Sequence, residues 1–333
     1  MRAPGRMLAV LLLITAGSVR AAGAAELHVG LKRLTLRDPI GGGAMIGFAM
    51  YPTDVPAKSV TIGRVDTVAA EGAAPAPGRF PLLIFSHGMS SLPEMYLWLF
   101  EGLTARGFVV AGVAHPRDNY NDKSGSFGDA ELVERPRHVT ALIDGVASDA
   151  LLASSIDAAK IGIVGHSAGG YTALLAVGGR PDYTQFVGGR CRRAPAQPPD
   201  WPRFTHDAAA LPVPDPRIRA AAAMAPGFGC LFDRDSVSAI HVPLRFYQAD
   251  DDDVLQPGFN AAAFAALFTP PAEVVHFAKA GHFVFLNTCG FIMSLVARDI
   301  CRDPSPTNRD AVHQKLVDDL AQFFTETLDV KRR

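Results

Sequence analysis

The sequence has no excess of charge and no apolar run long enough to cross a membrane. Its 333 residues include 32 lysines and arginines and 33 aspartates and glutamates, which gives a formal net charge of −1. The only long run of one sign is "ADDDD", so no nucleic-acid partner is expected. The apolar run at residues 7–14 is too short for a bilayer. We therefore expect no membrane span in the mature chain.

Cysteine is scarce, and its spacing is not that of a metal site. No C-x-x-C occurs, and in an oxidising compartment an even number of cysteines favours two disulfides. We expect no metal and no cofactor. Three pairings are open. We expect Cys191–Cys230 and Cys289–Cys301, because each pair joins sequence neighbours near the site described below, and the first would attach an irregular insert to the loop after "AAAAMAPG".

Residues 1–25 have the three parts of a secretory signal peptide. Arginines precede the apolar run of residues 7–14, and the small-residue stretch "RAAGAAE" follows it. We expect cleavage after Ala24 or Ala25, the alternative being an uncleaved N-terminal anchor. Residues 26–333 would then form a single secreted or periplasmic α/β domain.

Eight segments have the pattern of β-strands. The first two, "LHVGLKRLTLRDP" and "AMIGFAMYP", alternate apolar and polar residues and are expected to be antiparallel. The third, "FPLLIFSHG", is continuously apolar, as in a strand that is buried on both faces. Strands then alternate with helices, which predicts a mostly parallel eight-stranded sheet covered on both faces. Helices are expected near residues 94–106, 134–152, 168–177, 259–268 and 310–328.

Residues 178–217 interrupt this alternation. They show no clear apolar period, and seven prolines fall between Pro195 and Pro216. A long loop of this kind is usually either a functional cover or a disordered segment. Its position directly after the predicted helix at 168–177 favours a cover.

The stretch "GHSAG" carries the pattern G-x-S-x-G, with Ser167 between Gly165 and Gly169. An apolar strand precedes it and a helix of small residues follows, which is the context in which such a serine is a nucleophile on a tight turn. The N–H of Ala168 would lie at the helix N-terminus and could stabilise an oxyanion. The alternative is a chance match, since the short pattern occurs in many sequences.

A serine nucleophile needs a base and an acid that orients the base. His282 follows the predicted strand "EVVHFA", and a run of four aspartates follows "PLRFYQA". Spacing alone does not choose among Asp250–Asp253. We select Asp252, because Asp250 belongs to the strand end, Asp251 would point to the other side, and Asp253 precedes apolar residues that turn into the core. The order Ser, Asp, His is that of α/β-hydrolases.

A second oxyanion donor is expected in "SHGMSS". Gly88 frees the backbone there, so that the N–H of Met89 could point into the site. His87 is an alternative base, but it precedes the serine in the chain, and a structural hydrogen-bonding role is favoured.

Four motifs together resemble a known family: "FPLLIFSHGMSSLPEMYLWLFEGLTARGFVVAGVAHP", "GHSAGG", "ADDDDVLQP" and "AGHFVFL". The sequence is similar to the exported serine hydrolases known as predicted dienelactone hydrolases, which are α/β-hydrolases related to the platelet-activating-factor acetylhydrolases. The resemblance runs from about His28 to the C-terminus and is absent from the insert at 178–217. It implies Ser167 as nucleophile, His282 as base and Asp252 as acid, with oxyanion donors at Met89 and Ala168. Authentic dienelactone hydrolases use a cysteine nucleophile, so dienelactone is not carried over as the substrate.

The predicted function is hydrolysis of a small-molecule or lipid-like carboxylic ester through an acyl-enzyme. A lipase or polyesterase is the main alternative, because the insert could cover a long apolar groove. A peptidase on this fold would usually carry a large N-terminal propeller domain, and a binding module without activity would be expected to have lost part of the triad.

Overall fold

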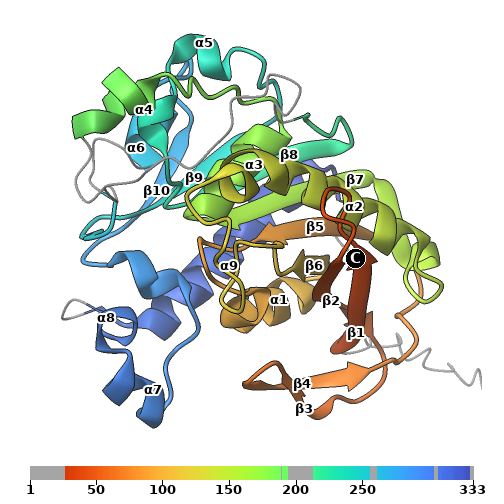
Figure 1. Cartoon of the computed structure of the whole chain (residues 1–333). Coiled ribbons are helices and arrows are strands. Elements are labelled where there is room, and N and C mark those ends of the chain that lie inside the picture. The colour runs from red at the N-terminus through yellow and green to blue at the C-terminus, as the bar shows by residue number, and fades with distance from the viewer. Residues whose placement is uncertain (1–26, 189, 194–212, 256–260, 304–306, 331–333) are drawn as a thin grey trace, which may run out of the picture.

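The structure is a computed structural model that describes residues 27–188, 190–193, 213–255, 261–303 and 307–330. The predicted signal peptide and most of the predicted insert lie outside these residues. The described chain forms a mixed β-sheet with helices on both faces (Figure 1).

Ten strands make up the sheet, in the order β10-β9-β8-β7-β5-β6-β2-β1-β4-β3. The six strands from β10 to β6 are parallel to one another, whereas β2 is antiparallel to both β6 and β1. The strands are β1 His28–Arg37, β2 Ala44–Thr53, β3 Lys58–Ile62, β4 Val65–Glu71, β5 Phe80–Ser86, β6 Val109–Val113, β7 Ile156–His166, β8 Ile218–Met224, β9 Leu244–Ala249 and β10 Glu273–Phe277.

The sheet has two more strands than predicted, and these two form a hairpin. All eight predicted segments are strands, and the structure adds β3 and β4, which pair antiparallel and join the sheet where β4 runs parallel to β1. The two added strands mix exposed and partly exposed residues with buried ones. They lack the continuous apolar run that marks the central strands in the sequence.

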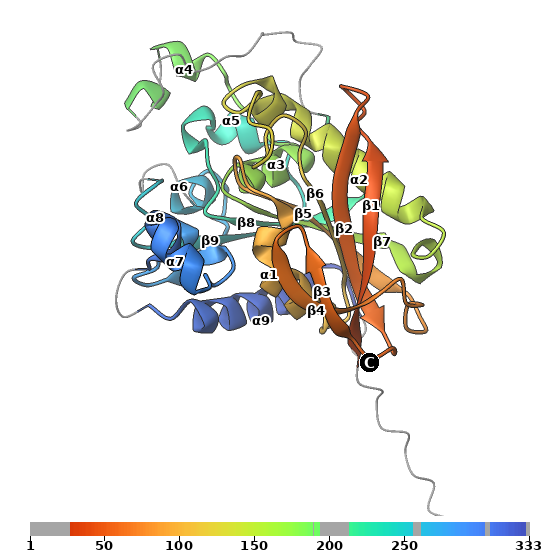
Figure 2. The same cartoon turned by 60° about the horizontal axis from the view of Figure 1, so that its bottom comes forward.

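Apolar side chains fill two cores, one on each face of the sheet. Successive side chains of a strand point to opposite faces. In β5, Leu82 and Ile84 accordingly belong to the core that α2 and α3 cover, whereas Leu83 and Phe85 belong to the core under α1 and α9. Figure 2 shows these two helix pairs on opposite sides of the sheet.

The longest helices match the predicted positions, with shifted ends. The segment expected at 134–152 begins with a π-helical turn, and its α-helix ends at Ser148. The helices are η1 Pro93–Tyr96, α1 Leu97–Thr104, η2 Ala130–Glu134, α2 Arg135–Ser148, η3 Ala153–Ser155, α3 Ala168–Ala176, α4 Gln185–Gly188, η4 Arg190–Arg193, η6 Gly229–Leu231, α5 Arg234–Val237, α6 Ala261–Ala265, η8 His282–Phe285, α7 Phe291–Val296, α8 Arg298–Cys301 and α9 Arg309–Thr327. Of the helices in the described residues, none has the length and apolar character needed to cross a membrane.

The parallel strands bring the predicted site residues to one edge of the sheet. Met89 follows β5, Ser167 follows β7, Asp252 follows β9 and His282 follows β10. Because these strands are parallel, their carboxyl ends lie at the same edge, where open α/β sheets form their sites.

Candidate active site

Ser167 lies at the sharp turn between β7 and α3. Its backbone has φ 55° and ψ −119°, a strained conformation for a residue with a side chain. The Ser167 N–H donates to the carbonyl of Met224 at 2.9 Å, and its own carbonyl accepts from Tyr171 at 3.1 Å and Gly227 at 3.0 Å. These bonds hold the strand–turn–helix geometry that the G-x-S-x-G pattern predicted.

Gly165 and Gly169 let two backbone segments pass close together at this turn. A Cβ atom at Gly165 would overlap the backbone of Gly169, and one at Gly169 would overlap the carbonyl of Ser86. Backbone atoms cannot move aside as the end of a flexible side chain can. A larger residue at either position would therefore displace the turn from the end of β5.

His282 and Asp252 form a buried pair. His282 Nδ1 lies 2.8 Å from Asp252 Oδ2, and the two side chains are 3% and 2% exposed. A carboxylate accepts hydrogen bonds, so Nδ1 carries the proton, and Nε2 of the neutral ring is left as an acceptor. The pairing of β9 with β10 brings the two loops together.

Asp252 is the member of the run Asp250–Asp253 that reaches the histidine. Its second oxygen accepts two backbone N–H groups of the following turn, at 3.0 and 2.7 Å, which fixes the carboxylate. Asp250 instead contacts His276, whose Nδ1 lies 2.7 Å from it. The other two aspartates are exposed. The structure thus pairs His282 with the aspartate that the sequence argument selected.

His166 and Tyr96 connect the segments around Ser167. The ring centroids of His166 and His282 are 4.8 Å apart, and Nδ1 of His166 lies 2.9 Å from the Tyr96 hydroxyl. That hydroxyl also accepts from the N–H of Gly88 at 3.3 Å. Burial, together with His282, lowers the pKa of His166 well below 6.5, so its ring stays neutral. Sequence analysis assigned no role to either residue.

Met89 lies on the loop after β5 and Ala168 is the first residue of α3, and the parallel pairing of β5 with β7 continues to Ser86 and Gly165 at this edge. Gly88 packs close to the serine: a Cβ atom there would lie 3.5 Å from Ser167 Cβ. Within the described part of the chain, neither Met89 nor Ala168 donates its backbone N–H to another residue. Two backbone donors are therefore open beside the serine.

His87, the alternative base, is fully buried and has both ring nitrogens occupied. Nε2 accepts from the N–H of His115 at 3.0 Å, so Nδ1 carries the proton and donates to the carbonyl of Gly88 at 2.7 Å. Burial, followed by the charge of Arg135, lowers the pKa of His87 to about 3. The structure thus gives His87 a hydrogen-bonding position in the loop and leaves it no nitrogen for Ser167.

A buried polar cluster behind this loop was missed by sequence analysis. Its charged residues stand in "HPRDNY" and "ELVERPRH", which have the composition of exposed segments. In the structure each member is at most 1% exposed: His87, His115, Asp118, Glu131, Arg135 and His138. No sequence signal marks the cluster, because its members come from three separate stretches of the chain.

Both predicted disulfides are present. Cys191–Cys230 has its Cα atoms 5.1 Å apart and connects η4, within the predicted insert, with η6, and Cys289–Cys301 has them 5.6 Å apart. In the described residues no cysteine is left free.

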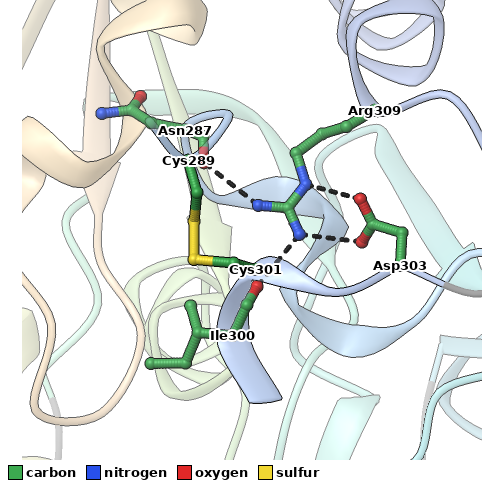
Figure 3. The surroundings of a disulfide bond; sticks show 6 residues. All are labelled: Asn287, Cys289, Ile300, Cys301, Asp303 and Arg309. Atoms are coloured by element: carbon green, nitrogen blue, oxygen red, sulfur yellow. Dashed lines mark hydrogen bonds and ion pairs between the residues drawn. A yellow bond between two sulfur atoms is a disulfide. The ribbon is translucent and has the colours of Figure 1, made fainter. Parts of the chain in front are cut away.

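Arg309 braces the segment that Cys289–Cys301 closes (Figure 3). Its guanidinium makes a two-pronged ion pair with Asp303 at 2.8 Å and also donates to the carbonyls of Asn287 and Ile300, each at 3.0 Å. This segment follows η8 directly, so the bridge and the ion pair stiffen the chain just beyond His282.

A cavity of about 190 Å³ lies beside His282. Both polar and apolar atoms line it, from Asp253, Gly281, His282, Phe283, Asp299, Arg302 and Asp303. Among the described residues no group of three His, Cys, Asp or Glu side chains is placed to hold a metal ion.

Comparison with known proteins gives a matching family and similar solved structures. Residues 54–139 match the family described as platelet-activating factor acetylhydrolase, isoform II. The ferulic acid esterase from Streptomyces cinnamoneus is similar in structure, with a TM-score of 0.63 and 17% identity over 95% of this chain and 94% of that one. The chain has the α/β-hydrolase fold. No protein of curated function matches the sequence. The two matches confirm the predicted resemblance to α/β-hydrolase esterases and support the predicted class, a carboxylic-ester hydrolase.

Proposed function

We propose that the chain is an exported serine hydrolase that cleaves carboxylic esters through an acyl-enzyme, with Ser167, His282 and Asp252 as its triad. The observation that carries the proposal is the buried His282–Asp252 pair at the same sheet edge as a strained serine turn. Such a constellation is identified by geometry and roles rather than by sequence position.

The chemistry follows from the protonation of the pair. As Ser167 Oγ attacks the ester carbon, its proton passes to His282 Nε2, and Asp252 stabilises the imidazolium that forms. The carbonyl electrons move onto oxygen, where the N–H groups of Met89 and Ala168 donate to the oxyanion. When the carbonyl reforms, the bond to the alcohol breaks and His282 returns the proton to that alcohol. Water then repeats the sequence on the acyl-serine and frees the acid and the enzyme.

We propose a small ester as the substrate. The cavity beside His282 is smaller than the roughly 300 Å³ at which sites for drug-sized ligands begin. The partial match to a family named for removing acetyl groups points the same way.

Export is part of the proposal. The N-terminal residues have the composition of a signal peptide, and both disulfides belong in an oxidising compartment. A fractionated native host should hold the protein outside the cytoplasm, with a mature N-terminus near residue 25 in mass spectrometry.

Replacement of the serine tests the function. Ser167→Ala should abolish both turnover of p-nitrophenyl acetate and labelling by a fluorophosphonate, since triad losses cost on the order of 10⁴-fold or more. The control is Ser238→Ala, which removes an exposed hydroxyl bonded to a local carbonyl and should change neither. Undiminished labelling of Ser167→Ala would overturn the assignment.

An acyl-length series of p-nitrophenyl esters tests the substrate class. We expect the highest kcat/KM at two to four carbons, a chain length on the order of what so small a cavity can bury. A maximum at about eight carbons or more, the length at which an extended apolar groove contributes to binding, would identify a lipase or polyesterase instead.

A further inference from the structure

We propose that the buried pair Arg135–Asp118 holds the loop of Met89 so that its N–H points at the reacting oxygen. Arg135 and Asp118 would thus be positioning residues for ester hydrolysis. The inference rests on the function proposed above and goes beyond it, because it identifies what sets the direction of one oxyanion donor.

The pair lies behind the loop, away from water. Both side chains are fully buried, and Asp118 Oδ2 accepts from Arg135 Nη2 at 2.6 Å and from Nε at 3.1 Å. Burial by itself would raise the pKa of Asp118, but Arg135 and the Ser126 hydroxyl hold it below its ordinary value. Asp118 is therefore ionised throughout the neutral range.

Arg135 holds the two carbonyls that precede Met89. Its Nη1 donates to the carbonyl of His87 at 2.6 Å, and its Nη2 donates to that of Gly88 at 3.3 Å. The Gly88 carbonyl belongs to the same peptide group as the Met89 N–H. Fixing that oxygen fixes the direction of the N–H, because the peptide group is planar.

Asp118 holds the other side of Met89. Its Oδ1 accepts from the N–H of Ser90 at 3.1 Å and from the Ser126 hydroxyl at 2.6 Å. Ser90 has φ 52°, an unfavourable value for serine that persists only where the surroundings impose it. The ion pair thus anchors the peptide groups on both sides of Met89.

Neighbouring side chains complete the anchoring. His87 Nδ1 donates to the Gly88 carbonyl, and the Tyr96 hydroxyl accepts from the Gly88 N–H. The backbone N–H groups of Gly88 and Ser90 thus each have a hydrogen-bond partner, whereas that of Met89 has none among the described residues. An ordinary surface turn needs no such support.

Energetics favour a positioning role over a stabilising one. Burying two charges costs several kcal/mol per ion, and an apolar pair of similar volume often gives equal or greater stability. Apart from the contacts between Arg135 and Asp118, the pair makes four hydrogen bonds to the loop of Met89 or to Ser126. The Ser126 hydroxyl also contacts that of Ser90. A pair kept only to strengthen the fold would not need to be directed at one loop.

Arg135→Lys and Asp118→Asn test the proposal. Lysine keeps the charge but cannot reach two carbonyls and the carboxylate at once, so the Met89 N–H should lose its direction. We expect kcat for p-nitrophenyl acetate to fall by about 10²-fold with little change in KM, the size expected for a small misplacement of a catalytic group or the loss of one oxyanion donor.

A readout specific to the oxyanion separates positioning from general damage. Sulfur accepts hydrogen bonds poorly, so the ratio of kcat/KM for p-nitrophenyl acetate to that for its thiono analogue measures the oxyanion donors. The ratio should fall in both variants, and the affinity for phenylboronic acid, which forms a tetrahedral adduct with the serine, should fall in parallel with kcat. Unchanged ratios with reduced kcat would overturn the proposal.

Arg217→Lys is the matched control. Arg217 also makes a two-pronged pair, with Asp215 at 2.9 and 2.6 Å, but it lies at the amino end of β8, opposite the site. That variant should lose stability without a change in the thiono ratio. If the Arg135 variant does not fold, Ser126→Ala, which removes one contact to Asp118, should still lower the ratio. Loss of activity in Ser167→Ala together with unchanged ratios here would reject the positioning role while leaving the proposed function in place.

Discussion

His313 stacks on Trp98, with ring centroids 3.8 Å apart and planes 1° from parallel, and both rings hold the short helix that begins at His282. His313 Nε2 donates to the carbonyl of Val284 at 2.7 Å, and Trp98 Nε1 donates to that of Phe285 at 3.2 Å. Two helices from opposite ends of the chain, α1 and α9, therefore fix the position of the proposed base.

Removing one of these donors should weaken catalysis more than binding. Trp98→Phe keeps an aromatic ring against His313 but loses the N–H to Phe285. We expect a several-fold fall in kcat, as for a small displacement of a catalytic group, with KM nearly unchanged and stability lowered by about 1 kcal/mol for the lost hydrogen bond. Steady-state kinetics and urea unfolding measure the two effects. A rise in KM at constant kcat would contradict this role.

Asn at each position of the acidic run tests the triad. Asp252→Asn should lower kcat by about 10³- to 10⁴-fold while the protein stays folded, because His282 loses the partner that sets its tautomer. Asp250→Asn is the matched control, since Asp250 contacts His276 and not His282. A severe effect at one of the exposed aspartates, with Asp252→Asn active, would show that another carboxylate orients the base.

Stability should fall in acid because buried histidines stay neutral in the folded chain. Burial is the largest cause that lowers the pKa of His87 to about 3 and those of His138 and His313 to about 4, from 6.5. Between these values and 6.5 the unfolded chain binds more protons, so this stability is present above pH 6.5 and is lost as the pH falls. Each proton contributes about 1.4 kcal/mol per pH unit. Urea titrations from pH 8 to pH 4.5 measure the slope, and a constant free energy of unfolding would contradict it.

Glu131 should have the opposite pH dependence. Burial, and then the charge of Asp118, raises its pKa from 4.5 to about 8. The folded chain keeps this proton after the unfolded chain has released it, so the contribution is full below pH 4.5 and is lost as the pH rises to about 8. Glu131→Gln resembles the protonated side chain and should be more stable than the native protein at pH 9. The difference should shrink towards pH 5.5, and an equal difference at both pH values would contradict the prediction.

The two disulfides should contribute separately to stability. Closing loops of 39 and 12 residues is worth about 4 and about 3 kcal/mol on the loop-entropy model. Two double variants, Cys191→Ala with Cys230→Ala and Cys289→Ala with Cys301→Ala, should each have a lower melting temperature. A reducing agent should lower the melting temperature of each variant further only through the disulfide that the variant still has. Peptide mapping without reduction checks the connectivity independently.

The fold was largely predictable because buried parallel strands are continuously apolar. β5 and β7 stand out in the sequence, and G-x-S-x-G marks the turn after β7. The hairpin of β3 and β4 was missed because its strands lie half in water and interrupt their apolar residues with lysine, serine, threonine and aspartate.

The site residues that could be chosen were those whose geometry is local. Asp252 was selected by counting residues past the end of a strand. Ser167 was selected because its two flanking glycines belong to the same turn. Arg135 could not be found this way, because its partners Asp118 and His87 are 17 and 48 residues away and a charged residue at a helix start is usually solvated. What makes it part of the site is burial, and burial is decided by the packing of α2 on the sheet.

The position of α9 has a consequence for biosynthesis. Ser167 and the loop of Met89 have been translated by the middle of the chain, whereas His282 depends on His313 in a helix that ends at Thr327. A nascent chain leaving the ribosome would therefore carry the proposed nucleophile long before the proposed base is in place. With the proposed triad, Ser167 would stay as unreactive as any alcohol until α9 had been synthesised and had docked, so activity would appear only after that step.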